Sequence, residues 1–294
     1  MKKKQKIILI VAICATAVIA AVVALALNYH KIYVYAQTKG WFRQDVAIEE
    51  RKADEFRAYT IEELEGDSRV KFDQSMMLVN KEHFLPEGFV PDILEYKDTK
   101  VYMSSCMIDA YARLSAAVKE NTGNKLYVSS DFRTSEEQEA LYQEDPITAT
   151  IPGASEHQTG LALDVYVAYY AGDGFVKSRS GRFVNSHAHE YGFIIRYPSY
   201  GEDITGIRFE PWHIRYVGHP HSDVIYNNHI TLEEYIDGLK IGQWYEIGEY
   251  LVCRQNLTDA GFVLPDGFES CTISPDNTGS YVLTVKIPLP LKCG

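Results

Sequence analysis

Hydrophobic residues recur at three- and four-residue intervals through residues 104–121, and this spacing predicts an amphipathic helix. Its apolar stripe consists of Met107, Ala110, Tyr111, Leu114 and Val118. A second helix is expected to begin at Thr134 and run to about residue 143, because Thr134 and Glu137 match a capping box. A third helix is expected over residues 182–191. Short apolar runs predict strands over residues 76–80, 126–130, 160–168, 193–195 and 205–215.

The pattern changes near the C-terminus. Apolar runs over residues 245–253, 268–273 and 281–287 predict short strands separated by proline and glycine. We therefore expect a small β-rich module over residues 239–294. Residues 29–75 are mixed and charged, and we interpret them as a stalk with helical stretches. Residues 76–238 lie between the two and are expected to form the domain that carries the candidate chemistry.

The N-terminal residues 7–27 are apolar except for Thr16 and follow four lysines. About 20 apolar residues suffice for a helix to cross a bilayer, so residues 1–28 are expected to be cytoplasmic lysines and a single transmembrane anchor. Positive charge before the span favours a cytoplasmic N-terminus and an extracellular remainder. The alternative is a signal peptide cleaved at Ala24-Leu25-Ala26. We prefer the anchor, because the apolar run is longer than a usual signal core.

The chain is acidic, with a formal net charge of -11, although it starts with a cluster of lysines. Such a charge argues against nucleic acid and anionic lipid as ligands, since both carry negative phosphates. Five cysteines are too few for a disulfide scaffold in a chain of this length. Among Cys253, Cys271 and Cys293 one pair could be oxidised, and the sequence does not say which.

Two short segments about fifty residues apart carry the candidate chemistry. The first contains His157 and Asp164, and the second contains Glu210 and His213. Two imidazoles and a carboxylate are a typical ligand set for catalytic zinc, which keeps its fourth position for water. The remaining carboxylate can then take a proton from that water.

Both carboxylates lie in apolar surroundings, where a charge is costly unless it is paired or bound to a metal. Asp164 follows the apolar run that begins at Gly160, and Glu210 follows Phe209. In a regular strand Glu210 and His213 would face opposite sides. A strand there must therefore bend or end near Pro211 if both are to face one metal ion.

Four other histidines compete for a metal: His187, His189, His219 and His221. Their i,i+2 spacing puts both members of a pair on one face only in an extended segment. Both pairs fall in predicted helix or turn, so we expect these histidines on the surface.

Several ordered motifs then connect the chain to a known family. They are Ser130-Asp131-Phe132-Arg133-Thr134 with Gln138, Ser155-x-His157-x-x-Gly160-x-Ala162-x-Asp164, Tyr191-Gly192-Phe193 and Glu210-Pro211-Trp212-His213, preceded by Leu78-Val79-Asn80-Lys81 and Leu85-Pro86. Over roughly residues 76–235 the chain resembles the VanY-type D-alanyl-D-alanine carboxypeptidases. These belong to a group of zinc peptidases that includes the VanX dipeptidases and the hedgehog-like fold.

The resemblance implies an α+β fold in which helices pack against a small, mostly antiparallel sheet. It also implies one catalytic zinc ion (Zn2+), a catalytic base and residues that lie beside the substrate. These are the zinc ligands His157, Asp164 and His213, the base Glu210, and the substrate residues Arg133, Gln138 and Ser155. The implied substrates are peptidoglycan precursor peptides that end in D-Ala-D-Ala and lose the terminal D-Ala.

Arg133 has two expected roles, as its planar fork suits either a developing oxyanion or a substrate carboxylate. The alternative is a surface salt bridge with Glu136 or Glu137. The position of Arg133 just before a helix start, with Gln138 one turn later, favours a shared site.

Other functions compete with this one. A D,D-dipeptidase or a peptidoglycan endopeptidase of the same fold would use the same zinc site. A serine enzyme would need Ser68, which begins a Ser-x-x-Lys sequence, but Ser68 lies in the expected stalk and Lys292-Cys293-Gly294 matches the rest of that pattern poorly. A non-enzymatic module for cell wall or a partner would use aromatics such as Trp244, Tyr245 and Tyr250, which we expect instead in a sheet core.

Overall fold

The computed structural model describes residues 3–41, 43–52 and 56–288, and the chain divides after Trp41 into two compact units. The first unit is built on one helix, α1 (Lys3–Thr38), whose stretch Lys4–Thr38 is long and apolar enough to cross a membrane. The Thr16 hydroxyl donates to the carbonyl oxygens of Ala12 and Ile13. The polar side chain in the apolar run is thus satisfied within the helix, as a bilayer would require.

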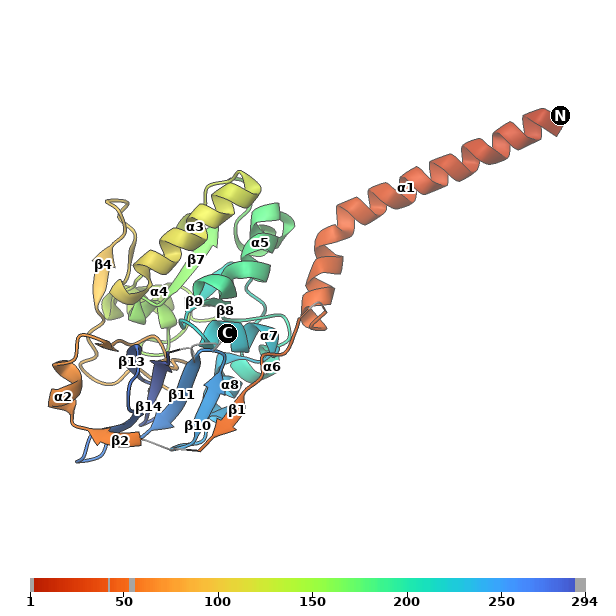
Figure 1. Ribbon diagram of the computed structural model, residues 1–294. Helices are drawn as coiled ribbons and strands as arrows, with labels where there is room; N and C mark the ends of the chain where they lie inside the picture. Colours follow the sequence, from red (N-terminus) through yellow and green to blue (C-terminus); the bar gives the residue numbers. More distant parts are fainter. Residues whose placement is uncertain (1–2, 42, 53–55, 289–294) are drawn as a thin grey trace, which may run out of the picture. The chain divides into compact units, whose positions relative to one another are not determined.

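Two larger sheets and two strand pairs organise the second unit (Figure 1). The six-stranded sheet has the order β1-β10-β11-β14-β13-β3, and the four-stranded sheet has the order β6-β7-β9-β8. All pairings in the smaller sheet are antiparallel. The strands are β1 (Glu49–Arg51), β2 (Phe56–Tyr59), β3 (Val70–Phe72), β4 (Ile93–Glu95), β5 (Tyr102–Ser104), β6 (Tyr127–Ser130), β7 (Ala162–Tyr166), β8 (Phe193–Ile195), β9 (His213–Tyr216), β10 (Trp244–Ile247), β11 (Tyr250–Gln255), β12 (Phe262–Pro265), β13 (Ser270–Pro275) and β14 (Tyr281–Lys286).

The helices of this unit are short, apart from α3 and α4. They are α2 (Ile61–Glu65), α3 (Ile108–Thr122), α4 (Ser135–Glu144), α5 (Arg179–His187), α6 (Glu202–Thr205), α7 (His221–Asn227) and α8 (Leu232–Gly238), with 3₁₀ turns η1 (Ser105–Met107), η2 (Glu156–Thr159), η3 (Gly172–Lys177) and η4 (Ala188–Tyr191). The capping box predicted at the start of α4 is confirmed, since Thr134 Oγ1 accepts from the backbone of Glu137. The predicted stripe of α3 is buried.

One core lies between the four-stranded sheet and the helices α3 and α5. Leu163 and Val165 of β7 point into this core, together with Ile214 of β9 and Leu114 of α3. Because side chains alternate along a strand, Asp164 of β7 points to the opposite face. The predicted α+β arrangement, with helices against a small antiparallel sheet, is confirmed.

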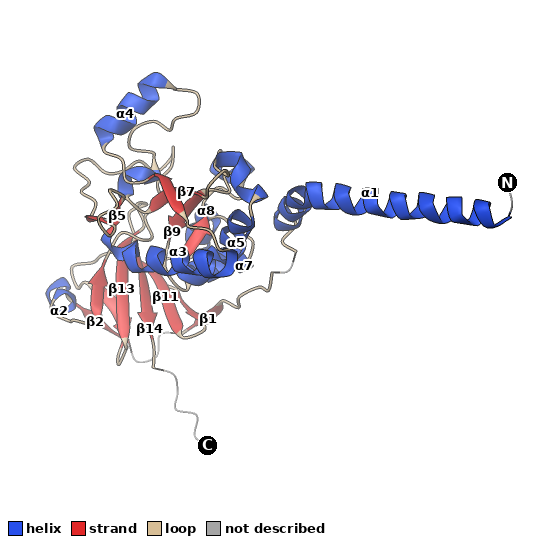
Figure 2. Cartoon of the chain, turned by 90° about the horizontal axis from the view of Figure 1, so that it is seen from above, coloured by secondary structure: helices blue, strands red, loops and turns tan. Residues whose placement is uncertain are grey.

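The six-stranded sheet joins distant parts of the chain (Figure 2). Helices α7 and α8 pack on one of its faces, and β2, β12 and α2 contribute to the core on the other. Its edge strands β1 and β3 come from residues 29–75, the expected stalk. Trp244 and Tyr245 are buried in these cores, as predicted.

Three strand predictions differ from the structure: those for residues 76–80, 245–253 and 205–215. Residues 76–79 are deeply buried, yet residues 76–80 pair with no strand in the described part of the chain. Their backbone is bonded instead to side chains and a loop: Arg215 donates to the Met77 carbonyl, and Leu78 N–H donates to the Asp276 carbonyl. The run over 245–253 forms two strands, because Gly248 takes a positive φ of 61° and turns the chain between β10 and β11.

Candidate active site

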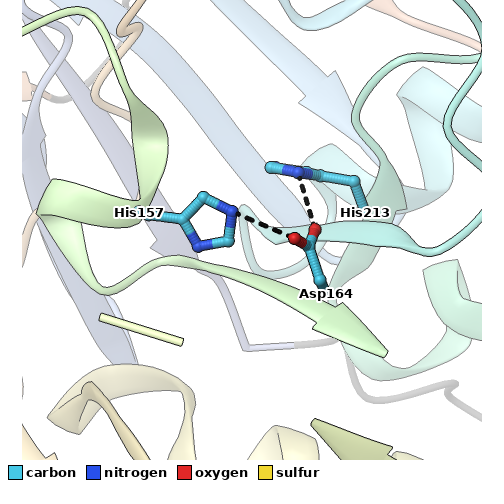
Figure 3. Close-up of side chains that lie close together, drawn as sticks. All are labelled: His157, Asp164 and His213. Carbon is cyan, nitrogen blue, oxygen red and sulfur yellow. Dashed lines mark ion pairs between the residues drawn. The ribbon is translucent and has the colours of Figure 1, made fainter. Parts of the chain in front are cut away.

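Asp164 and His213 are direct neighbours across two strands. They are register partners in the antiparallel pair β7–β9, so their side chains leave the sheet on the same face. His213 Nδ1 lies 3.1 Å from Asp164 Oδ1 (Figure 3). The sheet itself therefore fixes two of the three expected metal ligands.

His157 reaches the same point from the turn η2. Gly160 ends this turn with a φ of 69°, and a Cβ at Gly160 would lie only 2.3 Å from Ile93 Cδ1. His157 Nε2 lies 3.5 Å from Asp164 Oδ2, and His157 Nδ1 lies 2.9 Å from the carbonyl oxygen of Asp131. A carbonyl only accepts, so Nδ1 carries the hydrogen and Nε2 presents its lone pair to the site.

Glu210 joins the site because the strand begins later than expected. Residues 205–212 are not strand, which corrects the prediction for 205–215; β9 begins at His213. His213 N–H donates to the Glu210 carbonyl, and this turn contains Pro211. Glu210 Oε2 consequently lies 3.7 Å from His213 Nδ1. The predicted break near Pro211 is confirmed.

The donor set suits a divalent cation. Ligand atoms of His157, Asp164 and His213 all lie within 4.8 Å of one another. Asp164 Oδ1 is buried and accepts no hydrogen bond from the described residues. Burial lowers the pKa of His213, but Asp164 and Glu156 outweigh burial and raise it to about 9. The site thus favours positive charge, and two imidazoles with one carboxylate are ligands that zinc prefers.

The two carboxylates of the site differ in proton affinity. Burial raises the pKa of Asp164, but the adjacent imidazoles of His157 and His213 outweigh it and hold that pKa well below its usual range. Burial raises the pKa of Glu210 above its ordinary value, with nearby Asp164 adding to the rise and His213 opposing it. Divergent pKa values in one cavity are typical of a charged ligand beside a proton acceptor.

One cavity of about 590 Å³ is lined by every candidate residue. Arg133 Nη1 donates to Gln138 Oε1 at 2.6 Å, and Nη2 donates to Ser130 Oγ at 2.7 Å. Glu137, an alternative partner for Arg133, is bonded instead to the backbone N–H of Thr134. Gln138 is fully buried and Ser155 is 6 % exposed. Arg133, Gln138 and Ser155 thus share the cavity with the three metal-ligand candidates and Glu210.

Four charged residues that form a buried network escaped the sequence analysis, and the first of them also lines the cavity: Glu156, Arg196, Arg215 and Glu233. Arg196 Nε and Arg215 Nη1 donate to Glu156 Oε1 at 2.7 and 2.6 Å. Arg196 also pairs with Glu233. Arg196 follows an apolar run and Arg215 interrupts one, the same signal that drew attention to Asp164.

The other histidines lie away from the three ligands. The prediction that all four lie on the surface is wrong for His221, which is 2 % exposed. It is buried because α8 and β14 pack against it and provide Tyr235 and Thr284 as hydrogen-bond partners. His189 and His219 both pair with Asp223.

The structure bears on the possible disulfide near the C-terminus and on the possible serine nucleophile. Cys253 and Cys271 are buried free thiols, so these two are not paired with each other; Cys293 lies outside the described residues. Ser68 does not line the cavity, and the triplet Lys292-Cys293-Gly294 also lies outside the described residues.

A family model described as VanY, D-alanyl-D-alanine carboxypeptidase, matches residues 100–219, a stretch that includes all seven candidate residues. The D-alanyl-D-alanine carboxypeptidase of Enterococcus faecium is 36% identical over 170 residues, which cover 53% of this chain and 54% of that protein. The bifunctional D-Ala-D-Ala dipeptidase and D-Ala-D-Ala carboxypeptidase VanXYC of Enterococcus gallinarum is 36% identical over 182 residues, 56% of this chain and 95% of that protein.

Two solved structures are similar. The LdcB LD-carboxypeptidase matches with a TM-score of 0.51 at 35% identity, over 55% of this chain and 86% of that chain. The vancomycin resistance D,D-dipeptidase VanXYg, in complex with a D-Ala-D-Ala phosphinate analog, matches with a TM-score of 0.61 at 24% identity, over 82% of this chain and 99% of that chain. The fold is therefore of the VanX/VanY type. Residues 76–238 are little more than half of the chain, so the similarity to VanXYg extends beyond them.

Proposed function

This chain belongs to the VanY family of D-alanyl-D-alanine carboxypeptidases, and we propose that it removes the terminal D-Ala from peptidoglycan precursor peptides by zinc-dependent hydrolysis. The observation that carries the proposal is the meeting of His157, Asp164 and His213 within 4.8 Å. Glu210 lies beside this cluster, and Arg133 lines the same cavity.

A zinc ion held by these three ligands would supply Lewis acidity, which polarises a carbonyl and makes water more acidic. Glu210 accepts the proton of the attacking water as the water oxygen bonds to the scissile carbonyl carbon. It then delivers the proton to the amide nitrogen as the C–N bond breaks and D-alanine leaves. The raised pKa of Glu210 supports this role, since a stronger base accepts the proton more readily.

Arg133, Gln138 and Ser155 are proposed to recognise the end of the substrate. A guanidinium fork binds a carboxylate through two parallel hydrogen bonds. Arg133 is held from behind by Gln138 and Ser130, so its orientation is set before substrate binds. A fixed fork costs less conformational entropy on binding than a free side chain. This arrangement favours a substrate with a free terminal carboxylate.

The choice of the peptide bond that is cleaved, between two D-residues or between an L- and a D-residue, is also part of the proposal. The similar LdcB is named an LD-carboxypeptidase, and VanXYC is named both a dipeptidase and a carboxypeptidase. An L,D-carboxypeptidase activity is therefore the second candidate for this chain. It would use the same metal ligands and Glu210.

We also propose where the protein works. Helix α1 would anchor the chain, with the N-terminal lysines in the cytoplasm and the remainder outside, since positive charge stays inside. The length and composition of α1 also fit a signal sequence. The four expected parts of the chain stay a prediction: anchor (1–28), stalk (29–75), catalytic domain (76–238) and C-terminal module (239–294). Strands from 29–75 complete the sheet of the C-terminal module.

The test is mass spectrometry of a pentapeptide that ends in D-Ala-D-Ala, incubated with the full-length protein in detergent. The proposal expects loss of a single alanine, abolished by a zinc chelator and restored by added zinc. Release that continues unchanged after the chelator removes the metal would reject zinc dependence. Absence of any release by a zinc-loaded protein would reject the substrate.

A further inference from the structure

The second nitrogen of His213 faces a carboxylate that the mechanism does not use. His213 Nε2 lies 3.8 Å from Glu156 Oε2. Both atoms are buried, and neither has a hydrogen-bond partner among the described residues. The separation exceeds a hydrogen bond by less than about 1 Å. Two orphaned buried atoms that face each other match as donor and acceptor if Nε2 carries a hydrogen.

Glu156 cannot turn away from His213. Its other oxygen, Oε1, accepts from both Arg196 and Arg215, and the side chains of all three residues are fully buried. Arg215 is fixed in turn, since its Nη2 donates to the carbonyl oxygens of Ser75 and Met77. These bonds also satisfy two carbonyl groups of a buried segment that has no strand partner among the described residues.

We propose that Glu156 is a positioning residue that accepts a hydrogen bond from His213 Nε2 and so directs the Nδ1 lone pair of His213 toward the metal. The inference rests on the proposed function, in which His213 is a ligand. His157 offers a parallel, because its Nδ1 is bonded to the Asp131 carbonyl and its Nε2 faces Asp164. Each imidazole thus gives one nitrogen to the site and the other to an acceptor, a common arrangement around bound metals.

Glu233 supplies the matched control. It pairs with Arg196 through both oxygens, at 2.6 and 2.8 Å, and therefore balances charge in the same network. Its partners are Arg196 and Asn80, not His213. Removal of the Glu233 charge disturbs the network as removal of the Glu156 charge does, but it leaves the acceptor of His213 in place.

The variant E156Q has a specific consequence. Guanidinium groups only donate, so the amide oxygen of Gln must stay with Arg196 and Arg215. The amide NH2 then faces His213 Nε2 and donates to it. This favours the tautomer that carries its hydrogen on Nδ1, the nitrogen that the metal needs.

Zinc affinity of the full-length protein is measured by chelator competition for wild type, E156Q and E233Q. The proposal expects E156Q to bind zinc about 10–100-fold more weakly, the usual effect of losing such a partner. E233Q should bind nearly as wild type does. An equal loss of zinc affinity in both variants would show that Glu156 only balances charge in the network, and would overturn the proposal. Wild-type zinc affinity in E156Q would also overturn it.

A second measurement needs no variant, so it also holds if E156Q fails to fold. In the ¹⁵N-histidine-labelled wild-type protein, the His213 Nε2–H should exchange slowly with water both with and without zinc. An Nε2 that carries no hydrogen, or one that exchanges as fast as an exposed histidine, would overturn the inference. A wild type that binds no zinc but keeps the slow Nε2–H would reject the proposed function and not this hydrogen bond.

Discussion

Arg133 donates a hydrogen bond from Nη1 to Oε1 of the fully buried Gln138, at 2.6 Å. Gln138 donates in turn to the carbonyl oxygen of Thr150, on the loop that follows α4. The guanidinium is therefore held by a buried amide that is itself fixed, rather than by a surface carboxylate. A guanidinium whose plane is fixed in this way is suited to bind a planar carboxylate through two hydrogen bonds.

Arg133→Lys should lower kcat/KM about 10-fold or more, although the charge is kept. An ammonium cannot replace the fork, and hydrogen bonds to charged groups contribute about 1.5–3 kcal/mol. The measurement is steady-state release of D-alanine. The control is Glu136→Gln, which removes an exposed charge from the first turn of α4, close to Arg133 in the chain, and should leave kcat/KM unchanged. Equal kinetics for Arg133→Lys and wild type would remove Arg133 from the substrate site.

Glu210→Gln should keep zinc but lose turnover. Gln has nearly the same shape, but its amide cannot accept and return the proton, and removal of a general base typically costs 10²–10⁴-fold. Zinc content by atomic absorption is the internal control, since Glu210 is proposed as base and not as ligand. If kcat stays near the wild-type value, another group accepts the proton.

Local signals predicted part of this fold well. The capping box of Thr134 and Glu137 marked the start of α4, because its two bonds lie within one turn. The apolar run before Asp164 marked β7, whose alternate residues enter the core. The break at Pro211 followed from the need to turn Glu210 and His213 to one side. In each case the residues that determine the local structure lie within a few positions of it in the sequence.

Long-range pairing was not predictable in the same way. The strands β1 and β3 are three residues each, too short to carry a pattern, and they form only because β10 and β13 offer free edges. Residues 76–80 have the composition of a strand, yet side chains such as Arg215 satisfy their backbone. The role of Glu156 was equally hidden, since its partners lie 40 and 59 residues away.

Metal binding should depend on His157 and not on His189. The wild-type protein should hold about one zinc per chain, and His157→Ala should lose most of it, because the remaining two ligands cannot fill the usual set of three. His189→Ala is the matched control, since His189 is bonded to Asp223 and lies outside the ligand cluster. Full zinc occupancy in His157→Ala would reject the assignment of the site.

His221 should make the protein less stable in acid. Burial, with a contribution from His219, lowers the pKa of His221 to about 3, whereas the unfolded chain should titrate near 6.5. Above pH 6.5 both states are neutral and the residue has no effect on pH dependence. As the pH falls below 6.5 the unfolded state alone binds the proton, so the free energy of unfolding falls until about pH 3.

Between pH 7 and pH 5 this residue alone should cost about 2 kcal/mol of the free energy of unfolding. Urea denaturation at the two pH values measures it. His221→Gln loses the hydrogen bonds to Tyr235 and Thr284 and should be less stable than wild type at pH 7. Between pH 7 and pH 5, however, its free energy of unfolding should fall by about 2 kcal/mol less than that of wild type. An identical pH dependence in both proteins would show that His221 is protonated in the folded state.

The last prediction concerns the end of the substrate. If the fork of Arg133 binds a terminal carboxylate, a pentapeptide that ends in D-Ala-D-Ala should be cleaved as the free acid and nearly ignored as the C-terminal amide. The acidic chain gives no long-range attraction for that carboxylate, so recognition must be local. Mass spectrometry of both peptides with the full-length protein measures the difference. The Arg133→Lys variant is the control. It should lower the ratio of the cleavage rate of the free acid to that of the amide, mainly because cleavage of the free acid becomes slower.

A tetrapeptide with one terminal D-Ala after an L-residue separates the L,D preference from the D,D preference. Equal cleavage of acid and amide, or cleavage only at an internal bond, would instead assign the protein as an endopeptidase.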